Sequence, residues 1–419
     1  MNKEKLSKEE KASYVLFVLC WLVYAIICMT KSAFSASVAS IVGEGLFTKS
    51  LAGTINSGYY IFYGGAQLLL AGLVDKISPV KLMNMSLFGG ILAMLGFAFA
   101  DNFWVMLVLW SLTGLLQFAM WPAVIRIISQ YLVPSHRAKA MVYMAFAYCS
   151  GMLANYASAA LILKLSDWRM LFRVFFVILA ITAFVWVFLT KKTIPVLEAQ
   201  VSLEINKKDD TKKNEKKGAF GVFFASGLVF MLVPSCIRTM MDMGLKNWVP
   251  TMITENYEVS ASFASMLTTI LLLVNLSGIY IVNYVHPKYI KSEAAAFGLC
   301  FVIALPFTLL LLLTGKIPVG VVVVLLTLVT TFMYSGHQLI NVIIPSKFAK
   351  MNLSGGAASI LNAVASLGAA GASFGYGYIA DRFGWTATIA VWNIMAVVAA
   401  GFAFLSVRRW NKFIKESED

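Results

Sequence analysis

Five ionisable residues of this sequence stand within long apolar runs: Lys31, Arg126, Arg238, Asp242 and His337. An ionisable side chain inside a membrane costs several kcal/mol unless it is paired or hydrated, so such residues mark functional sites by default. An ammonium or guanidinium group could bind a charged solute, and a carboxylate or imidazole could carry a proton. We therefore take these residues as candidates for solute binding and ion coupling.

Arg238 and Asp242 are four residues apart, so on a helix they share one face. They form either a structural ion pair or a pair that a solute or a proton opens. Lys31 lies near the middle of its apolar run, where a snorkelling side chain does not easily reach water. Arg126 follows the Pro122 kink and either pairs with the first helix or faces a cavity.

Two further groups of polar residues occur at helical spacing. Tyr60, Tyr63 and Gln67 recur on one helix and could form a polar stripe that faces a cavity. His337 has Asn341 one turn away, and it is either a satisfied, static residue or a proton carrier that titrates near neutral pH.

The elements that must position these residues are membrane helices. Of the 419 residues, 60% are hydrophobic and 13% are charged, against about 25% charged residues in soluble domains. A spanning helix needs about 20 mostly apolar residues. Twelve stretches qualify: 12–42, 51–74, 80–100, 104–131, 138–164, 170–190, 219–250, 260–284, 292–315, 318–345, 353–380 and 385–407. The sequence predicts an all-α membrane protein with twelve transmembrane helices.

The charged stretch 191–217 divides these helices into two sets of six. We expect one six-helix bundle over 1–190, a solvated linker over 191–217 and a second bundle over 218–419. Most of the other Lys and Arg residues fall between spans on the linker's side, whereas Lys246 is assigned to the opposite side. The positive-inside rule then predicts a multi-pass protein of the cytoplasmic (cell) membrane, with both termini and the linker in the cytoplasm.

Composition and spacing also exclude several classes of function. The net charge of +14 lies in short clusters between apolar runs, a pattern of membrane anchoring, so we expect no nucleic-acid partner. The five cysteines have no metal-ligand spacing, so we expect no metal site. The sequence has no phosphate-binding loop, HExxH or G-x-S-x-G motif, so we expect neither an enzyme nor a bound cofactor.

Two short motifs resemble signatures of the major facilitator superfamily. Ala71-Gly-Leu-Val-Asp75-Lys76 is similar to the G-x-x-x-D-R/K motif between helices 2 and 3 of that family, with Ala71 at the glycine position. Gly377-Tyr-Ile-Ala-Asp381-Arg382 repeats the spacing at the end of helix 11. The resemblance implies two pseudo-symmetric six-helix bundles, and it implies that Asp75, Lys76, Asp381 and Arg382 act in gating.

A narrower resemblance is to the organophosphate:phosphate antiporters. The stretch from Gly114 through Gln117, Trp121 and Pro122 to Arg126 is similar to their G-x-x-Q-x-x-x-W-P-x-x-x-R motif. Asn247-Trp-Val-Pro-Thr251 is similar to their D-W-x-P-T.

Four positions depart from that family. Its two phosphate-binding arginines fall on Thr30, beside Lys31, and on Asp242, its helix 2 lysine falls on Gln67, and its helix 5 histidine falls on Tyr148. Because lysine does not replace the bidentate arginine fork, these departures argue against a phosphate-ester substrate.

We therefore expect a secondary active transporter that moves a small anionic organic solute by alternating access, in symport with protons. The expected solute contacts are Lys31, Tyr63, Gln67, Arg126, Tyr148, Arg238, Asp242, His337 and Asn341, with Asp242 and His337 as proton carriers. In the empty carrier, Asp242 is the expected counter-charge of Lys31. The partners are the solute, a proton or phosphate as coupling ion, and the lipid bilayer, and we expect a monomer. Alternatives are organophosphate/phosphate exchange, with Lys31 and Arg238 as anion ligands, and a membrane sensor that keeps the carrier fold.

Overall fold

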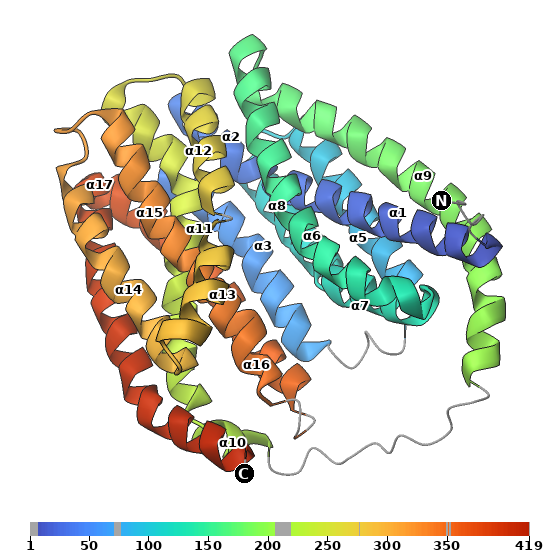
Figure 1. The fold of residues 1–419 in the computed structure, drawn as a ribbon. Coiled ribbons are helices and arrows are strands. Elements are labelled where there is room, and N and C mark those ends of the chain that lie inside the picture. Colours follow the sequence, from blue (N-terminus) through green and yellow to red (C-terminus); the bar gives the residue numbers. More distant parts are fainter. Residues whose placement is uncertain are drawn as a thin grey trace, which may run out of the picture.

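The structure is a computed structural model that describes residues 7–70, 77–205, 219–275, 277–348, 351 and 353–418. The described part of the chain is helical apart from turns, short connections and one isolated bridge between Thr314 and Ile317. Figure 1 shows the helices in two groups, α1–α9 and α11–α17, that lie side by side.

In the first group, local sequence signals explain where several helices begin. Ser7 and Glu10 form a capping box at the start of α1, and Thr48 and Asn102 cap α3 and α6. Proline opens α5 and α8, where its missing N–H costs nothing. The elements are α1 (Lys8–Lys31), α2 (Ala33–Gly43), α3 (Lys49–Leu69), α5 (Pro79–Phe97), α6 (Phe103–Gln117), α7 (Met120–Tyr131), α8 (Pro134–Leu165) and α9 (Trp168–Ile205).

The second group ends in one long helical element that turns back on itself. Gly384 in α17 has φ 79° and ψ 176°, a non-helical conformation that favours glycine, and Figure 1 shows the chain reversing in this element. The elements are α10 (Ala219–Ala225), α11 (Leu228–Tyr257), α12 (Ala261–Asn275), α13 (Ser277–Tyr289), α14 (Glu293–Leu310), η1 (Leu311–Leu313), α15 (Val319–Gln338), η2 (Leu339–Ile343), α16 (Ile344–Ser346) and α17 (Ser354–Glu418).

Ten helical segments in the described residues are long and apolar enough to cross a membrane. They do not include α3, which carries the polar residues Thr54, Asn56 and Ser57, and they count Gly356–Glu416 of α17 once although Gly384 interrupts it. The multi-helix membrane fold is therefore as predicted from the sequence. The number twelve fits if α3 and both limbs of α17 are counted, and it stays a prediction.

The stretch between the groups begins as helix. The predicted linker starts at residue 191, but α9 continues to Ile205 with Pro195 inside it, and α10 begins at Ala219. The helical part of the first group thus extends beyond the predicted boundary. Residues 206–218, the most charged part of the linker, lie outside the described residues.

The largest contact between the two groups joins α3 to α17, followed by α8 with α12 and α2 with α11. At one end of this interface, called here the Lys49 side, Lys49 forms an ion pair of 3.0 Å with Glu255, and Trp385 donates a hydrogen bond of 2.7 Å to the same carboxylate. The opposite end, called the linker side, is where α9 ends and α10 begins. The helices of the two groups are therefore joined at the Lys49 side by polar as well as apolar contacts.

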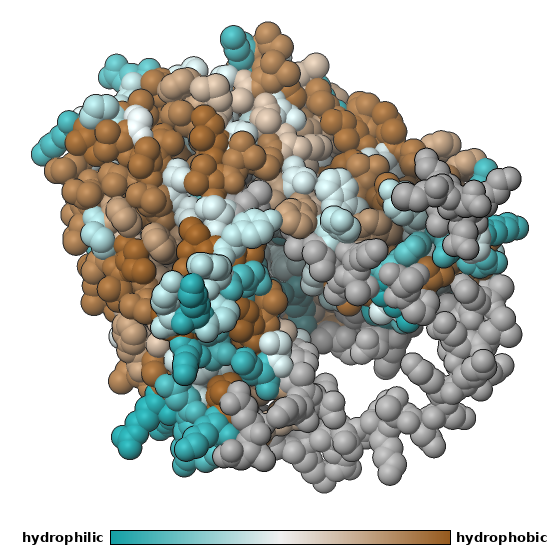
Figure 2. Space-filling view, in the orientation of Figure 1, coloured by the Kyte–Doolittle hydropathy of each residue, from teal (hydrophilic) through white to brown (hydrophobic). Residues whose placement is uncertain are grey.

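The surface fits a bilayer. Figure 2 shows apolar side chains over the flanks of the helices and hydrophilic ones gathered mainly near the ends. Large apolar residues such as Phe99, Phe184 and Leu405 are between 66% and 73% exposed. Such a surface is stable against hydrocarbon and unfavourable in water, which supports a multi-pass membrane protein.

Candidate solute-binding site

A ladder of three charges runs along one face of α11. Arg238, Asp242 and Lys246 follow at four-residue intervals, and each is no more than 3% exposed. The Lys246 Nζ lies 2.8 Å from the Asp242 carboxylate, and the Arg238 Nη1 lies 3.7 Å from it. The predicted Arg238–Asp242 pair is present, but Lys246 is the closer partner. Lys246, assigned from the sequence to an outer segment, is buried in this ladder.

Lys246 and Arg238, the two cations of the ladder, have different hydrogen-bond partners. The Lys246 ammonium donates to the Tyr334 hydroxyl of α15 at 3.3 Å and lies 4.3 Å from the centre of that ring. Arg238 donates through Nη2 to Thr239 at 2.6 Å, but its Nε and Nη1 find no hydrogen-bond acceptor in the described part of the chain. A buried guanidinium with free donors is expensive, so this group is ready to bind an anionic ligand.

Lys31 is held by aromatic rings. Its Nζ lies 5.3 Å from the centre of the Tyr63 ring and 5.8 Å from that of Tyr59, both on α3. No described carboxylate lies within ion-pair distance of Lys31, because the carboxylate of Asp242 is engaged along α11. The expectation that Asp242 is the counter-charge of Lys31 is therefore wrong. Cation–π contacts alone leave the ammonium short of full compensation.

The predicted polar stripe on α3 is only partly directed at these charges. Tyr60 contacts Met243 of α11, whereas Tyr63 lies under Lys31. Gln67 donates to the Phe118 carbonyl at 3.3 Å and accepts from Asn362 of α17 at 2.6 Å. Gln67 thus links α3 to the break between α6 and α7 and to α17 of the second group.

The remaining predicted contacts lie near the ladder. His337 of α15 is exposed, accepts or donates a 2.8 Å hydrogen bond with Asn341, and lies within electrostatic range of Arg238 and Lys246. Tyr148 of α8 lies within the same range of Asp242 and Tyr334. The structure therefore brings residues of α8, α11 and α15 around one centre, together with Tyr60 of α3.

Helix irregularities occur at the candidate residues. Ser32 separates α1 from α2 directly after Lys31, and residues 118–119 separate α6 from α7 directly after Gln117, which accepts a 2.9 Å hydrogen bond from Tyr59. Behind His337, α15 passes into the π-helical η2, which contains Asn341. Broken and π-helical segments commonly line functional cavities in membrane proteins, so these interruptions support the location of the site.

Other predicted site residues lie elsewhere. Arg126, near the middle of α7, donates a 2.9 Å hydrogen bond to the Ile77 carbonyl. The Asp381 carboxylate accepts from the backbone N–H groups of Lys49 and Ser50 at the start of α3. Arg382 is exposed and lies over the Tyr378 ring. The predicted gating residues Asp75 and Lys76 lie outside the described residues.

Lys246 and Tyr334 belong to this cluster although the sequence did not mark them as site residues. The signal for Lys246 was its distance of four residues from Asp242, which continues the spacing that marks the Arg238–Asp242 pair. Tyr334 carries no comparable signal, because it is one aromatic residue on an apolar helix. No group of three or more metal-ligating side chains occurs among the residues that the structure describes.

Comparisons with known proteins agree with this architecture. A model of the Major Facilitator Superfamily matches residues 20–372. The chain is 26% identical over 102 residues to the membrane sensor protein UhpC of Salmonella typhimurium (strain LT2), and 29% identical over 103 residues to that of Escherichia coli (strain K12). These matches cover 24% of this chain and 23% of either relative, so the chain spans about a quarter of the curated relatives that it matches.

Solved structures match over almost the whole chain. A bacterial homologue of the human lysosomal transporter Spinster has a TM-score of 0.79 at 14% identity, covering 97% of this chain and 99% of that one. A D-xylose–proton symporter has a TM-score of 0.70 at 14% identity, covering 94% and 98%. At this level of identity the comparison shows a shared fold.

Proposed function

Because the chain belongs to the major facilitator superfamily, we propose that it is a secondary transporter whose solute is a small organic anion. The family and the solved neighbours are transporters and not enzymes. The observation that carries the anion proposal is the excess of positive charge among the candidate residues: Arg238 and Lys246 share one carboxylate, that of Asp242, and Lys31 has no acidic partner among the described residues. An anion would supply the missing counter-charge and would accept from the unpaired Arg238 donors.

The proposed site takes residues from both helix groups, as alternating access requires. Lys31 and Tyr148 come from the first group, and the charge ladder with His337 comes from the second. The Lys49 side is held by inter-group contacts, so we propose that the solute enters and leaves this state from the linker side. Rocking of the two groups about the site would then open the Lys49 side.

Asp242 is suited to couple the solute to a proton. Two cations compensate its carboxylate. A solute anion that binds Arg238 or Lys246 removes part of that compensation, and a proton on Asp242 can replace it. Solute and proton would then favour each other's binding, which is the linkage that a symporter needs.

The first experiment is a thermal-shift screen of the purified protein, because a ligand that binds the folded state raises apparent stability. The panel contains sugar phosphates, hexuronates, simple carboxylates and neutral sugars. Arg238→Gln should weaken binding of the stabilising anion about ten- to a hundredfold, the worth of a charge-assisted hydrogen bond. Arg408→Gln, which changes an exposed arginine, is the matched control. Stabilisation by neutral sugars and not by anions would refute the proposal.

Coupling is tested with a charge-balanced variant. Asp242→Asn combined with Lys246→Met removes one acid and one base together, so the net charge of the ladder is unchanged. In proteoliposomes this variant should still exchange labelled solute but should no longer accumulate it under an imposed pH gradient. Accumulation equal to that of wild type would show that Asp242 has no part in coupling.

Two other functions remain in view because of specific observations. Organophosphate/phosphate exchange is favoured by the motif from Gly114 to Arg126, and it predicts counterflow that requires internal phosphate. A sensor that keeps the carrier fold is favoured by the match to UhpC, which is described as a membrane sensor protein. A sensor would bind the anion in the thermal-shift screen and show no uptake in proteoliposomes.

A further inference from the structure

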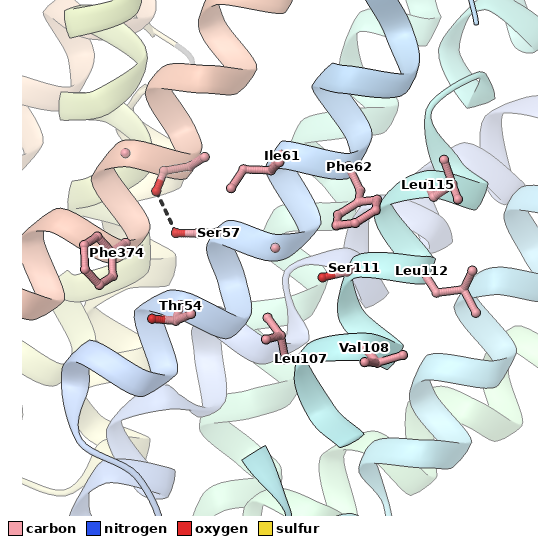
Figure 3. A pocket seen from close by; sticks show the side chains of 13 residues that line it. Thr54, Ser57, Ile61, Phe62, Leu107, Val108, Ser111, Leu112, Leu115 and Phe374 are labelled. Atoms are coloured by element: carbon pink, nitrogen blue, oxygen red, sulfur yellow. Dashed lines mark hydrogen bonds between the residues drawn. The ribbon is translucent and has the colours of Figure 1, made fainter. Parts of the chain in front are cut away.

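An apolar groove of about 700 Å³ opens on the outer surface between α3, α6 and α17 (Figure 3). Ile61 and Phe62 line it from α3, Val108 and Leu112 from α6, and Phe374 from α17. These five side chains are between 39% and 62% exposed. The groove is separate from the charged site and lies on the flank of the molecule that faces hydrocarbon.

Three hydroxyl residues line the groove, Thr54, Ser57 and Ser111, and two of them already donate hydrogen bonds to backbone carbonyls. The Ser57 hydroxyl donates to the Ala370 carbonyl at 2.7 Å, the interaction drawn in Figure 3, and the Thr54 hydroxyl donates to the Ser50 carbonyl at 2.9 Å. Water or a polar solute therefore finds little to bind. In a bilayer, a hydrocarbon chain in the groove gains mainly by packing against the apolar side chains that line it.

One end of the groove leads to a cation. Along α17 the Phe374 ring stacks on the Tyr378 ring with 5.9 Å between centres, and the Arg382 guanidinium lies 5.5 Å from the centre of the Tyr378 ring. From Phe374 to Arg382 is two helical turns, or about 12 Å along the helix. Arg382 is exposed and forms no ion pair within the described ranges, because the neighbouring Asp381 is turned to α3 and Lys49.

From this arrangement we propose that the groove and Arg382 together bind one anionic phospholipid. An acyl chain occupies the groove, and the phosphate group pairs with Arg382 at the membrane surface on the Lys49 side. The apolar lining of the groove suits an acyl chain, and Arg382 suits the phosphate group. Arg382 lies nearer the end of the helix than the groove does, as the phosphate lies nearer the membrane surface than the acyl chain. A phospholipid without net charge would fill the groove equally but would gain less from Arg382.

The lipid would contact both helix groups at once, since α3 and α6 belong to the first group and α17 to the second. It therefore adds to the contacts that hold α3 against α17. By mass action it favours the state in which the Lys49 side is closed.

The proposal is tested by lipid retention. The protein is reconstituted in nanodiscs of phosphatidylcholine and phosphatidylglycerol, extracted into mild detergent, and its retained lipids are counted by mass spectrometry. Wild type should retain phosphatidylglycerol. Arg382→Gln should lower the retained ratio of phosphatidylglycerol to phosphatidylcholine about fivefold, the effect of one basic residue near the surface. Val108→Trp, which fills the groove, should lower retention of both lipids.

Two matched controls separate this site from general surface effects. Arg173→Gln removes another exposed arginine that lies over an aromatic ring, Phe99, and Val105→Trp adds the same bulk to α6 outside the groove. Both should retain lipid as wild type does. The proposal is overturned if Arg382→Gln and Val108→Trp also retain wild-type amounts. It is equally overturned if the groove instead holds a second copy of the chain, seen as a dimer that Val108→Trp dissociates.

Discussion

On α11, Asp242 is the acid between two cations, and Lys246 lies closer to it than Arg238 does. Asp242→Asn would leave two buried cations without an acid, whereas Lys246→Met would leave the neutral Arg238–Asp242 pair. We therefore expect Asp242→Asn to be the more destabilising variant and to lower the free energy of unfolding by about 3–5 kcal/mol relative to wild type. Apparent melting temperatures in detergent measure this. The double variant should melt above Asp242→Asn, and a double variant that melts below both single variants would contradict the balance described here.

Lys31 lacks an acidic partner among the described residues, so the solute is its expected counter-ion. Lys31→Gln should weaken binding of the anion by about 1.5–3 kcal/mol, or about ten- to a hundredfold in Kd. Lys31→Arg should retain part of the affinity. Lys164→Gln, at an exposed position of α8, should change nothing. Isothermal titration with the stabilising anion gives the answer, and an unchanged Kd in Lys31→Gln would remove Lys31 from the site.

The residues that sequence analysis found and missed differ in a physical way. Lys31, Arg238, Asp242 and His337 are conspicuous because an ionisable group in an apolar run is expensive. Lys246 is equally expensive, but it stands near the expected end of a span, where a lysine normally reaches water. Only the folded chain shows that α11 continues to Tyr257 and buries it. The pairing of Asp242 within its own helix could likewise not be chosen over Lys31 from spacing alone.

At the scale of elements, the start of α3 is capped from the other helix group. Asp381 accepts from two N–H groups in the first turn of α3, where a carboxylate also interacts favourably with the helix dipole. Asp381→Asn should weaken this link and shift the protein toward opening on the Lys49 side, with solute Kd changed less than twofold because the site is distant. Asp101→Asn is the control, since Asp101 pairs with Arg169 inside the first group. A large loss of equilibrium binding in Asp381→Asn would contradict a gating role.

The close approach of α3 to α17 depends on glycine. A Cβ at Gly53 would overlap the Ser373 carbonyl, whereas a Cβ at Gly65 on the same helix meets nothing within 4 Å. Gly53→Ala should therefore force α3 and α17 apart. Because this contact joins the two helix groups, we expect solute uptake to fall several-fold. Gly65→Ala should transport as wild type does. Equal uptake by the two variants would show that α3 and α17 need not approach this closely.

Element positions followed from hydropathy, but element ends and breaks did not. Each of the stretches predicted from composition contains helix, because about 20 apolar residues leave few alternatives in a bilayer. The break at 118–119 lies one turn before Pro122, whose kink the sequence predicts, whereas the break at Ser32 and the π-helical η2 were not predicted. The extension of α9 to Ile205 was missed because Pro195 and the charges after residue 190 indicate the end of a membrane span, and a helix can continue beyond the membrane.

At the scale of the whole molecule, orientation rests on the distribution of basic residues. The linker side carries the C-terminal Arg408, Arg409, Lys412 and Lys415, whereas the Lys49 side has fewer cations, of which Lys49 and Arg169 are engaged in ion pairs. We propose that the linker side faces the cytoplasm. A cysteine at the exposed Lys412 should then be protected from a membrane-impermeant maleimide in intact cells, and a cysteine at the exposed Asp101 should be labelled.

The five native cysteines need no removal before this experiment if wild type gives no signal, since four are buried and Cys236 is half-buried. Permeabilised cells provide the matched control, because both introduced cysteines should then react. Labelling of Lys412→Cys and protection of Asp101→Cys in intact cells would reverse the orientation. The open end of the site would then face outward, and the gradient that drives accumulation would have to be reconsidered, although the anion site itself would stand.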